Sequence, residues 1–154
     1  MKFRIREIDV SDTNASKALV SLIYEAFDDG RLVLHYKPHK AGWWWIAYDE
    51  HGQPAAFAGM LPSRQFHGWG YLTLSGVSPP YRGYGLQRRL LKTRMKKARD
   101  LGWTTLCTET IHDNHMSQRN LILTGFMPYR PSKPWGDKHA VYWKRSLSRS
   151  PHAL

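Results

Sequence analysis

Residues 77–86 could bind a polyanion; they read Val-Ser-Pro-Pro-Tyr-Arg-Gly-Tyr-Gly-Leu. The apolar residues 71–74 precede them and a long amphipathic helical pattern follows. A tight turn between a strand and a helix gathers backbone N–H groups at the positive end of the helix dipole. Gly83 and Gly85 let the backbone approach a phosphate closely, and Arg82 adds a permanent positive charge. The segment therefore predicts a pyrophosphate-binding loop.

The glycine spacing of this loop matches neither common phosphate-binding fingerprint. The third glycine of the dinucleotide motif is absent, and so is the Gly-Lys-Ser/Thr of the P-loop. The full string, Val-x-Pro-x-x-Arg-Gly-x-Gly, resembles the acetyl-CoA loop of the GNAT superfamily of N-acetyltransferases. The core of that loop is Gln/Arg-x-x-Gly-x-Gly/Ala, and here its last small residue is replaced by glutamine. The resemblance implies acetyl-CoA as co-substrate, bound by Val77, Arg82, Gly83, Tyr84, Gly85, Leu86 and Gln87.

A second motif follows about thirty residues later, at a spacing similar to that of the family. The segment Asn-His-Met-Ser-Gln-Arg-Asn-Leu, residues 114–121, and the Thr-Gly-Phe of residues 124–126 resemble the family's Asn-x-x-Ala/Ser…Gly-Phe segment. In the family this segment is a short helix beside the pantetheine arm, followed by the penultimate strand. The resemblance covers roughly residues 43–145 and implies that Asn114, Ser117 and Asn120 also bind the cofactor.

The resemblance implies an α/β (α+β) fold of the GNAT type. Its central sheet is mixed, mostly antiparallel and twisted, with six to seven strands, about four helices, and strands that splay at the acetyl-CoA cleft. Periodicity and turn residues predict the same order of elements from the residues themselves. Strands are expected at 2–8, 43–48, 54–62, 69–77, 103–111, 126–129 and 140–144; helices at 86–101, 117–123 and from the capping residues 11–14 to Gly30; and a short helix or a loop at 32–41.

Composition suits one compact domain. A chain of 154 residues can bury about two-thirds of its unfolded surface in a single core, which predicts one domain over residues 1–146 and a flexible tail over 147–154. One cysteine excludes an internal disulfide framework. No apolar run reaches membrane-spanning length and the first residues begin no signal peptide, so a cytoplasmic protein without a membrane partner is expected.

The net charge of +11 has three interpretations. Eight basic residues cluster around the helix predicted at 86–101. They could form a solvated helix face, attract the phosphates of CoA, or bind a nucleic acid. Basic residues also occur along the rest of the chain and no nucleic-acid motif accompanies them. The expected partner is an amine acceptor, on a protein or a small molecule; tRNA or another polyanion, and a homodimer, are left open. The eight are Arg82, Arg88, Arg89, Lys92, Arg94, Lys96, Lys97 and Arg99.

Glu109 is the predicted catalytic base. In the family an amine attacks the thioester of acetyl-CoA directly, without a covalent enzyme intermediate, and a carboxylate or a linked water removes its proton. Glu109 precedes Asn114 by five residues on a predicted strand, and some family members place a catalytic glutamate at that spacing. An ordinary exposed glutamate, or one paired with an arginine, is the structural alternative. The resemblance also implies that a backbone N–H at the end of the strand at Val77 polarises the carbonyl.

One residue of the family pattern is missing. Many members carry a tyrosine seven positions after the asparagine, which protonates the departing thiolate, whereas this chain has Leu121. Because a thiol pKa lies near 8.5, a thiolate is a fair leaving group without an acid. Tyr129, Ser117 or water could replace the tyrosine. The departure also admits a derivative of the fold that binds CoA, or a nucleic acid, without catalysis.

Other candidate sites are weaker. Cys107 and the segment His-Asp-Asn-His at 112–115 fit no standard zinc spacing, so no metal is expected. Residues 43–45 are three tryptophans, and strand alternation places at least one of them in the core. A substrate-facing aromatic platform is the alternative interpretation. His35, Tyr36 and His39 occupy the position of the family's first substrate loop.

Overall fold

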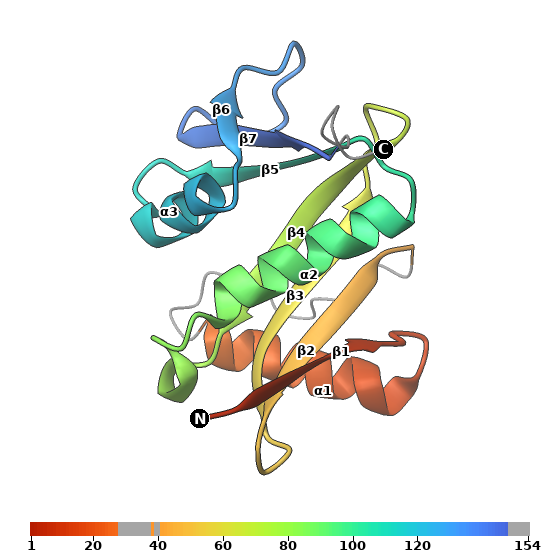
Figure 1. Cartoon of the computed structure of the whole chain (residues 1–154), viewed down its shortest axis with the longest axis vertical. Coiled ribbons are helices and arrows are strands. Elements are labelled where there is room, and N and C mark those ends of the chain that lie inside the picture. The colour runs from red at the N-terminus through yellow and green to blue at the C-terminus, as the bar shows by residue number, and fades with distance from the viewer. Residues whose placement is uncertain (28–37, 39–40, 148–154) are drawn as a thin grey trace, which may run out of the picture. The chain divides into compact units, whose positions relative to one another are not determined.

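A computed structural model describes residues 1–27, 38 and 41–147 (Figure 1). The chain divides into two compact units, one of Met1–Leu61 with Thr73–Leu91 and one of Pro62–Leu72 with Lys92–Leu154. Gly30, most of the segment predicted at 32–41, the residues His35, Tyr36 and His39, and nearly all of the predicted tail lie outside the described residues.

The fold is mixed α/β, as predicted. The strand order of its seven-stranded sheet is β1-β2-β3-β4-β5-β7-β6. Strand β4 pairs parallel with β5, whereas β1 with β2, β2 with β3, β5 with β7, and β6 with β7 are antiparallel. Three α-helices and one 3₁₀ turn occur among the described residues. The elements are β1 (Phe3–Ile8), α1 (Thr13–Ala26), β2 (Trp43–Asp49), β3 (Pro54–Pro62), β4 (Trp69–Val77), η1 (Pro79–Tyr81), α2 (Leu86–Asp100), β5 (Thr105–Ile111), α3 (His115–Leu123), β6 (Met127–Tyr129) and β7 (Ala140–Ser146).

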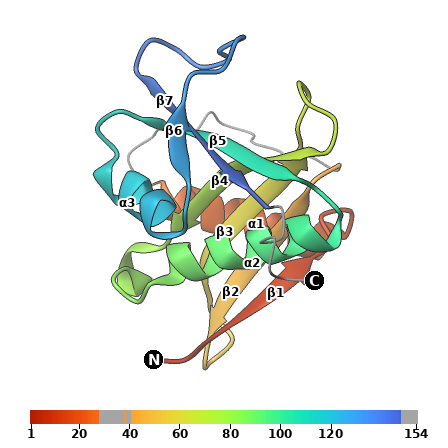
Figure 2. The same cartoon turned by 45° about the horizontal axis from the view of Figure 1, so that its top comes forward.

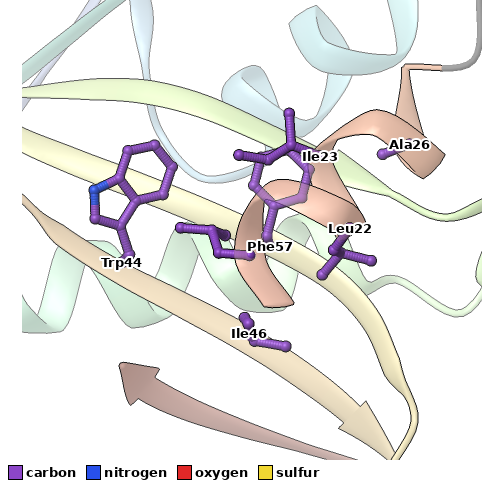
Figure 3. Close-up of a cluster of buried hydrophobic side chains, with 7 residues drawn as sticks. Leu22, Ile23, Ala26, Trp44, Ile46 and Phe57 are labelled. Carbon is purple, nitrogen blue, oxygen red and sulfur yellow. The ribbon is translucent and has the colours of Figure 1, made fainter. Parts of the chain in front are cut away.

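In the first unit, helix α1 packs on the antiparallel strands β1, β2 and β3. Figure 3 shows the apolar stripe of α1 with side chains of β2 and β3. Strand alternation is relaxed in β2, where both Trp44 and Trp45 are buried, so the expectation of a core tryptophan is confirmed. The cluster comprises Leu19, Leu22, Ile23, Ala26, Trp44, Ile46 and Phe57.

Helix α1 begins at a local cap and ends beside a tertiary contact. The Asp12 carboxylate accepts a hydrogen bond from the backbone N–H of Ala15 at 2.9 Å, which confirms an N-cap among the predicted residues. The helix ends at Ala26, so the prediction that it continues to Gly30 is wrong. Phe27 leaves the helical region of backbone space, with ψ at 57°, and its ring packs edge-on against Phe57.

In the second unit, β5, β7 and β6 lie side by side, with α3 in the connection between β5 and β6 (Figure 2). Glu109 on β5 is the register partner of Tyr142 on β7, which in turn faces Tyr129 on β6. Directly opposed residues of antiparallel strands share one face of a sheet, so these three side chains form a row. Pro128 is tolerated because β6 is an edge strand: it pairs only with β7, so the missing N–H breaks no hydrogen bonds to a strand on the other side.

Helix α2 buries the predicted apolar face, Leu86, Leu90, Leu91, Met95 and Ala98. Leu101 was expected on this face but is exposed, because the helix ends at Asp100 and the chain turns there. Arg94 belongs to the predicted basic cluster, but the structure buries it, and burial lowers its pKa to about 9. No helix within the described ranges has the length and apolarity to cross a membrane.

Candidate active site

The predicted phosphate loop of the first unit has the backbone of an anion site. Gly83 and Gly85 adopt φ of 90° and 75°, in the left-handed region that favours glycine. The carbonyl of Gly85 accepts the first bond of α2, from the N–H of Arg89 at 3.1 Å. In the described part of the chain no hydrogen bond uses the N–H groups of Gly83, Tyr84, Gly85 or Leu86. These donors at the start of α2 suit phosphate oxygens.

Arg82 holds this loop in place. Its Nε donates to the Val77 carbonyl at 3.2 Å, and its Nη2 donates to the Ala26 carbonyl at 3.3 Å. The second bond satisfies a carbonyl at the C-terminus of α1, where a cation is favoured. The guanidinium charge that the sequence assigns to phosphate binding is therefore also a tether between the loop and α1.

Aromatic contacts also fix the loop to the first strand. The Tyr81 hydroxyl donates to the Asp49 carboxylate at 2.8 Å. The rings of Tyr81 and Tyr84 lie 6.0 and 5.5 Å from that of Phe3. Tyr84 is exposed and Gln87 is half-buried, while Leu86 enters the core. The glutamine that replaces the family's small residue is thus accommodated at the helix start.

The second predicted cofactor segment forms helix α3. The Asn114 side chain caps this helix by accepting a hydrogen bond from the Ser117 N–H at 3.3 Å, and Asn120 is buried. Leu121 is also buried, so the position that carries the family's tyrosine serves core packing here. These contacts give Asn114, Ser117 and Asn120 local structural roles; their contact with pantetheine stays a prediction.

The second unit contains the most organised polar cluster near a predicted catalytic residue. Both carboxylate oxygens of Glu109 accept hydrogen bonds: the Tyr71 hydroxyl donates to Oε1 at 2.6 Å and the indole Nε1 of Trp135 donates to Oε2 at 2.7 Å. Glu109 is half-buried, and within the described ranges it forms no ion pair. Neither alternative for Glu109, an ordinary exposed glutamate or an arginine partner, describes this geometry.

The groups around Glu109 are themselves fixed. The Trp135 ring lies edge-on to Tyr142 at 4.7 Å and to Tyr71 at 6.2 Å, and the Tyr142 hydroxyl accepts from the Gly136 N–H at 2.8 Å. Burial, followed by the charge of Glu109, raises the pKa of Tyr71, which keeps the phenol protonated as a donor. The carboxylate is therefore held in one orientation, with lone pairs left to accept another proton.

Sequence reasoning missed Tyr71, Trp135 and Tyr142. Tyr71 could have been found from the strand pairing, because a strand that runs parallel to β5 places one of its side chains next to Glu109. In the structure Tyr71 pairs with Cys107, which precedes Glu109 by two residues. Tyr142 carried a similar signal through the β5–β7 register. Trp135 lies between β6 and β7 in a segment of proline, serine and glycine, where no periodicity predicts its direction.

Cys107 is unsuited to nucleophilic catalysis. Burial, then the charge of Glu109, raises the pKa of its thiol to about 12, so the thiol stays protonated. Its Sγ donates to the Gly70 carbonyl at 3.5 Å. Among the residues that the structure describes, no group of three or more histidine, cysteine, aspartate or glutamate side chains could hold a metal ion.

The mixed α/β fold and the glycine loop at the start of α2 suit an acyltransferase. The model of the Acetyltransferase (GNAT) family matches residues 5–126, and the chain belongs to this family. The family is one of acetyl-CoA-dependent enzymes, which confirms the resemblance drawn from the two motifs. No curated protein matches the chain at a significant level.

Solved structures share the fold at low sequence identity. A putative acyl-CoA N-acyltransferase from Klebsiella pneumoniae is 20% identical, covers 95% of this chain and 98% of its own, and has a TM-score of 0.74. The ribosomal-protein-S18-alanine N-acetyltransferase from Escherichia coli is 18% identical over 99% of both chains, with a TM-score of 0.71. A Bacillus subtilis acetyltransferase in complex with CoA is 17% identical, over 96% of this chain and 100% of its own, with a TM-score of 0.72.

Proposed function

We propose that the protein transfers the acetyl group of acetyl-CoA to a primary amine, with Glu109 as the general base. The observation that carries the proposal is the carboxylate of Glu109, which Tyr71 and Trp135 hold by both oxygens. A base that is already oriented loses little freedom when the amine arrives. Family membership supports acetyl-CoA as the donor.

The proposed reaction is a direct displacement. The neutral amine nitrogen bonds to the thioester carbonyl carbon, the amine proton passes to Glu109, and the carbon–sulfur bond breaks to release the CoA thiolate. The loop of residues 82–87 holds the pyrophosphate, and the backbone beside Val77 stabilises the developing oxyanion. Asn114, Ser117 and Asn120 contact the pantetheine arm in this scheme. Ser117 or water returns a proton to the thiolate, since Leu121 cannot.

The acceptor is the part of the proposal that experiment must identify. The E. coli structural neighbour is named for an alanine of a ribosomal protein, which supports including protein N-termini beside small amines. Incubation with acetyl-CoA and a cell lysate, followed by mass spectrometry of acetylated products, tests the proposal. A lysate in which no new acetylated amine appears, although CoA binds, would favour a non-catalytic derivative.

Removing the hydroxyl of Tyr71 is expected to slow catalysis without weakening the binding of acetyl-CoA. Tyr71→Phe deletes the donor to Oε1, so Glu109 loses one of its two orienting bonds and kcat falls by about tenfold. KM for acetyl-CoA stays unchanged. Steady-state kinetics across pH measure both parameters. Tyr71 itself stays protonated in the working range, so its own titration does not enter the comparison. A kcat equal to that of the wild type would contradict a positioning role for Tyr71.

Tyr81→Phe is the matched control for Tyr71→Phe. It deletes the same kind of bond, a phenol donating to a carboxylate, at Asp49 in the first unit. Because that bond fixes the loop to a hairpin and does not touch Glu109, kcat should hold while Tm falls. Equal losses of kcat in both variants would mean that Tyr71 acts through general stability.

Nucleic-acid binding is expected to be weak and dependent on salt. The basic cluster around α2 has fewer free charges than its sequence suggests, since Arg94 is buried and the Lys96 ammonium pairs with Asp100 at 3.1 Å. Affinity for tRNA, measured across a salt series, should vanish near physiological ionic strength. Tight binding there, with a log–log slope of about one per phosphate neutralised, would instead make tRNA the partner.

A further inference from the structure

The second unit contains a pocket of about 620 Å³ beside the Glu109 cluster. This volume falls within the range of small-molecule sites. Tyr142 joins the pocket to the cluster: it lines the pocket, is the register partner of Glu109, and packs against the Trp135 ring. The lining is mostly apolar, from Pro128, Tyr129, Arg130, Pro131, Pro134, Ala140, Val141 and Tyr142.

The charges of this pocket oppose that of Glu109. Arg130 is exposed and, among the described residues that line the pocket, it is the one that is ionised; aspartate and glutamate are absent from these residues. In the described part of the chain no ion pair or hydrogen bond occupies its guanidinium. The Lys144 ammonium adds positive charge nearby, 4.9 Å from the centroid of the Tyr129 ring. The region therefore offers an anion site close to a carboxylate that suits a cation.

One residue of the pocket lining also has a polar atom without a partner. The Tyr129 hydroxyl is buried and makes no hydrogen bond with the residues that the structure describes. Burial is the main cause that raises the pKa of Tyr129 to about 12, so the hydroxyl keeps its proton and can donate. Buried polar groups in native proteins are nearly always satisfied, and one that is not calls for an explanation. A ligand oxygen would supply the missing partner.

We propose that this pocket receives the body of the acceptor, and that the acceptor is a small primary amine carrying an anionic group several bonds away. The inference rests on the proposed function. In it the amine lies at Glu109, the anion at Arg130 and the Tyr129 hydroxyl, and an alkyl chain or aromatic ring lies on the proline and tyrosine walls. Glu109 and Tyr129 are two strands apart, a span of about 10 Å. The amine and anion of an α-amino acid are too close together for that span.

Matched pairs of amines test the assignment. Para-aminomethylbenzoate is compared with benzylamine, and ε-aminocaproate with hexylamine, so that each pair differs in the acid group. The protein should prefer the acid member by about tenfold or more in kcat/KM, as charge-assisted bonds contribute. Arg130→Gln should raise KM for the acid member about tenfold. It should leave kcat for the acid member, and both kinetic parameters for the plain amine, unchanged. Lys133→Gln is the control, because this exposed cation of the same loop is not part of the pocket lining.

Tyr129→Phe provides a second variant with a separate readout. It should raise KM for the acid member several-fold without lowering Tm, since the deleted hydroxyl has no partner within the protein. A hydroxyl that is merely structural would lower Tm and leave the pairs unchanged. Equal use of acid and amine members by the wild type, or an Arg130→Gln variant with unaltered preference, would overturn the proposal.

Calorimetry separates this proposal from the proposed function. Para-aminomethylbenzoate is titrated into the wild type and Arg130→Gln without acetyl-CoA. Binding that requires Arg130 supports the pocket even when no acetylated product forms. Transfer to benzylamine without any binding of the acid probe refutes the pocket and leaves the acetyltransferase in place. Absence of both binding and transfer overturns both.

Discussion

Gly85→Val is expected to weaken CoA binding by about two powers of ten or more. Gly85 adopts a φ of 75°, which a β-branched side chain adopts only with strain, so the loop must rebuild around a valine. An added Cβ would meet no atom within 4 Å, so the strain comes from the backbone and not from a clash. Rebuilding turns the N–H groups of the loop away from the phosphates, each a charge-assisted bond. Calorimetry with CoA measures the loss.

Gly52→Val is the matched control for that experiment. Gly52 lies in the turn between β2 and β3 of the same unit, at φ of 79°, and an added Cβ there also has open space. The two variants thus carry a similar conformational cost at different places. Gly52→Val should lower Tm and keep CoA affinity. Equal affinity for CoA in folded Gly85→Val and wild type would remove the loop of residues 82–87 from the cofactor site.

The sequence predicted the elements that have a strong period or a definite punctuation. The hairpin of β2 and β3, the strand β4 and the helix α2 were predicted within one or two residues, because apolar runs, the helical period of α2 and the glycine turns mark them. The end of α1 was missed, since the packing of Phe27 on Phe57 is a tertiary contact that no local pattern encodes. Arg94 illustrates the same limit: its charge suggested solvent, and the fold buries it.

For the candidate site, the sequence pointed to the carboxylate but not to the side chains that hold it by hydrogen bonds. Glu109 followed from its spacing to Asn114, which a family motif fixes. Its hydrogen-bond donors come from β4 and from a loop, 38 and 26 residues away in sequence. Such donors depend on strand pairing and loop closure, which sequence periodicity does not determine. Trp135 in particular has a direction set by ring contacts with Tyr71 and Tyr142.

Glu109→Gln is expected to lower kcat by roughly one to three powers of ten, near the usual range for a lost general base. The substitution preserves the packing: the amide oxygen can accept from the Trp135 indole, and the amide NH₂ can donate to the Tyr71 hydroxyl oxygen. Only the capacity to take a proton is removed. CoA affinity should barely change, because the pyrophosphate is assigned to the loop of residues 82–87.

The pH dependence distinguishes the role of Glu109 from simple positioning. As pH rises, more of the acceptor is already neutral, so an enzyme without its base regains activity and the defect of Glu109→Gln shrinks. Tyr71 does not confuse the profile, since its raised pKa keeps it protonated throughout an assay near neutral pH. Glu50→Gln, at an exposed turn, controls for the loss of one negative charge. A defect that is constant with pH would assign Glu109 to orientation of the amine, and full activity would place the base elsewhere.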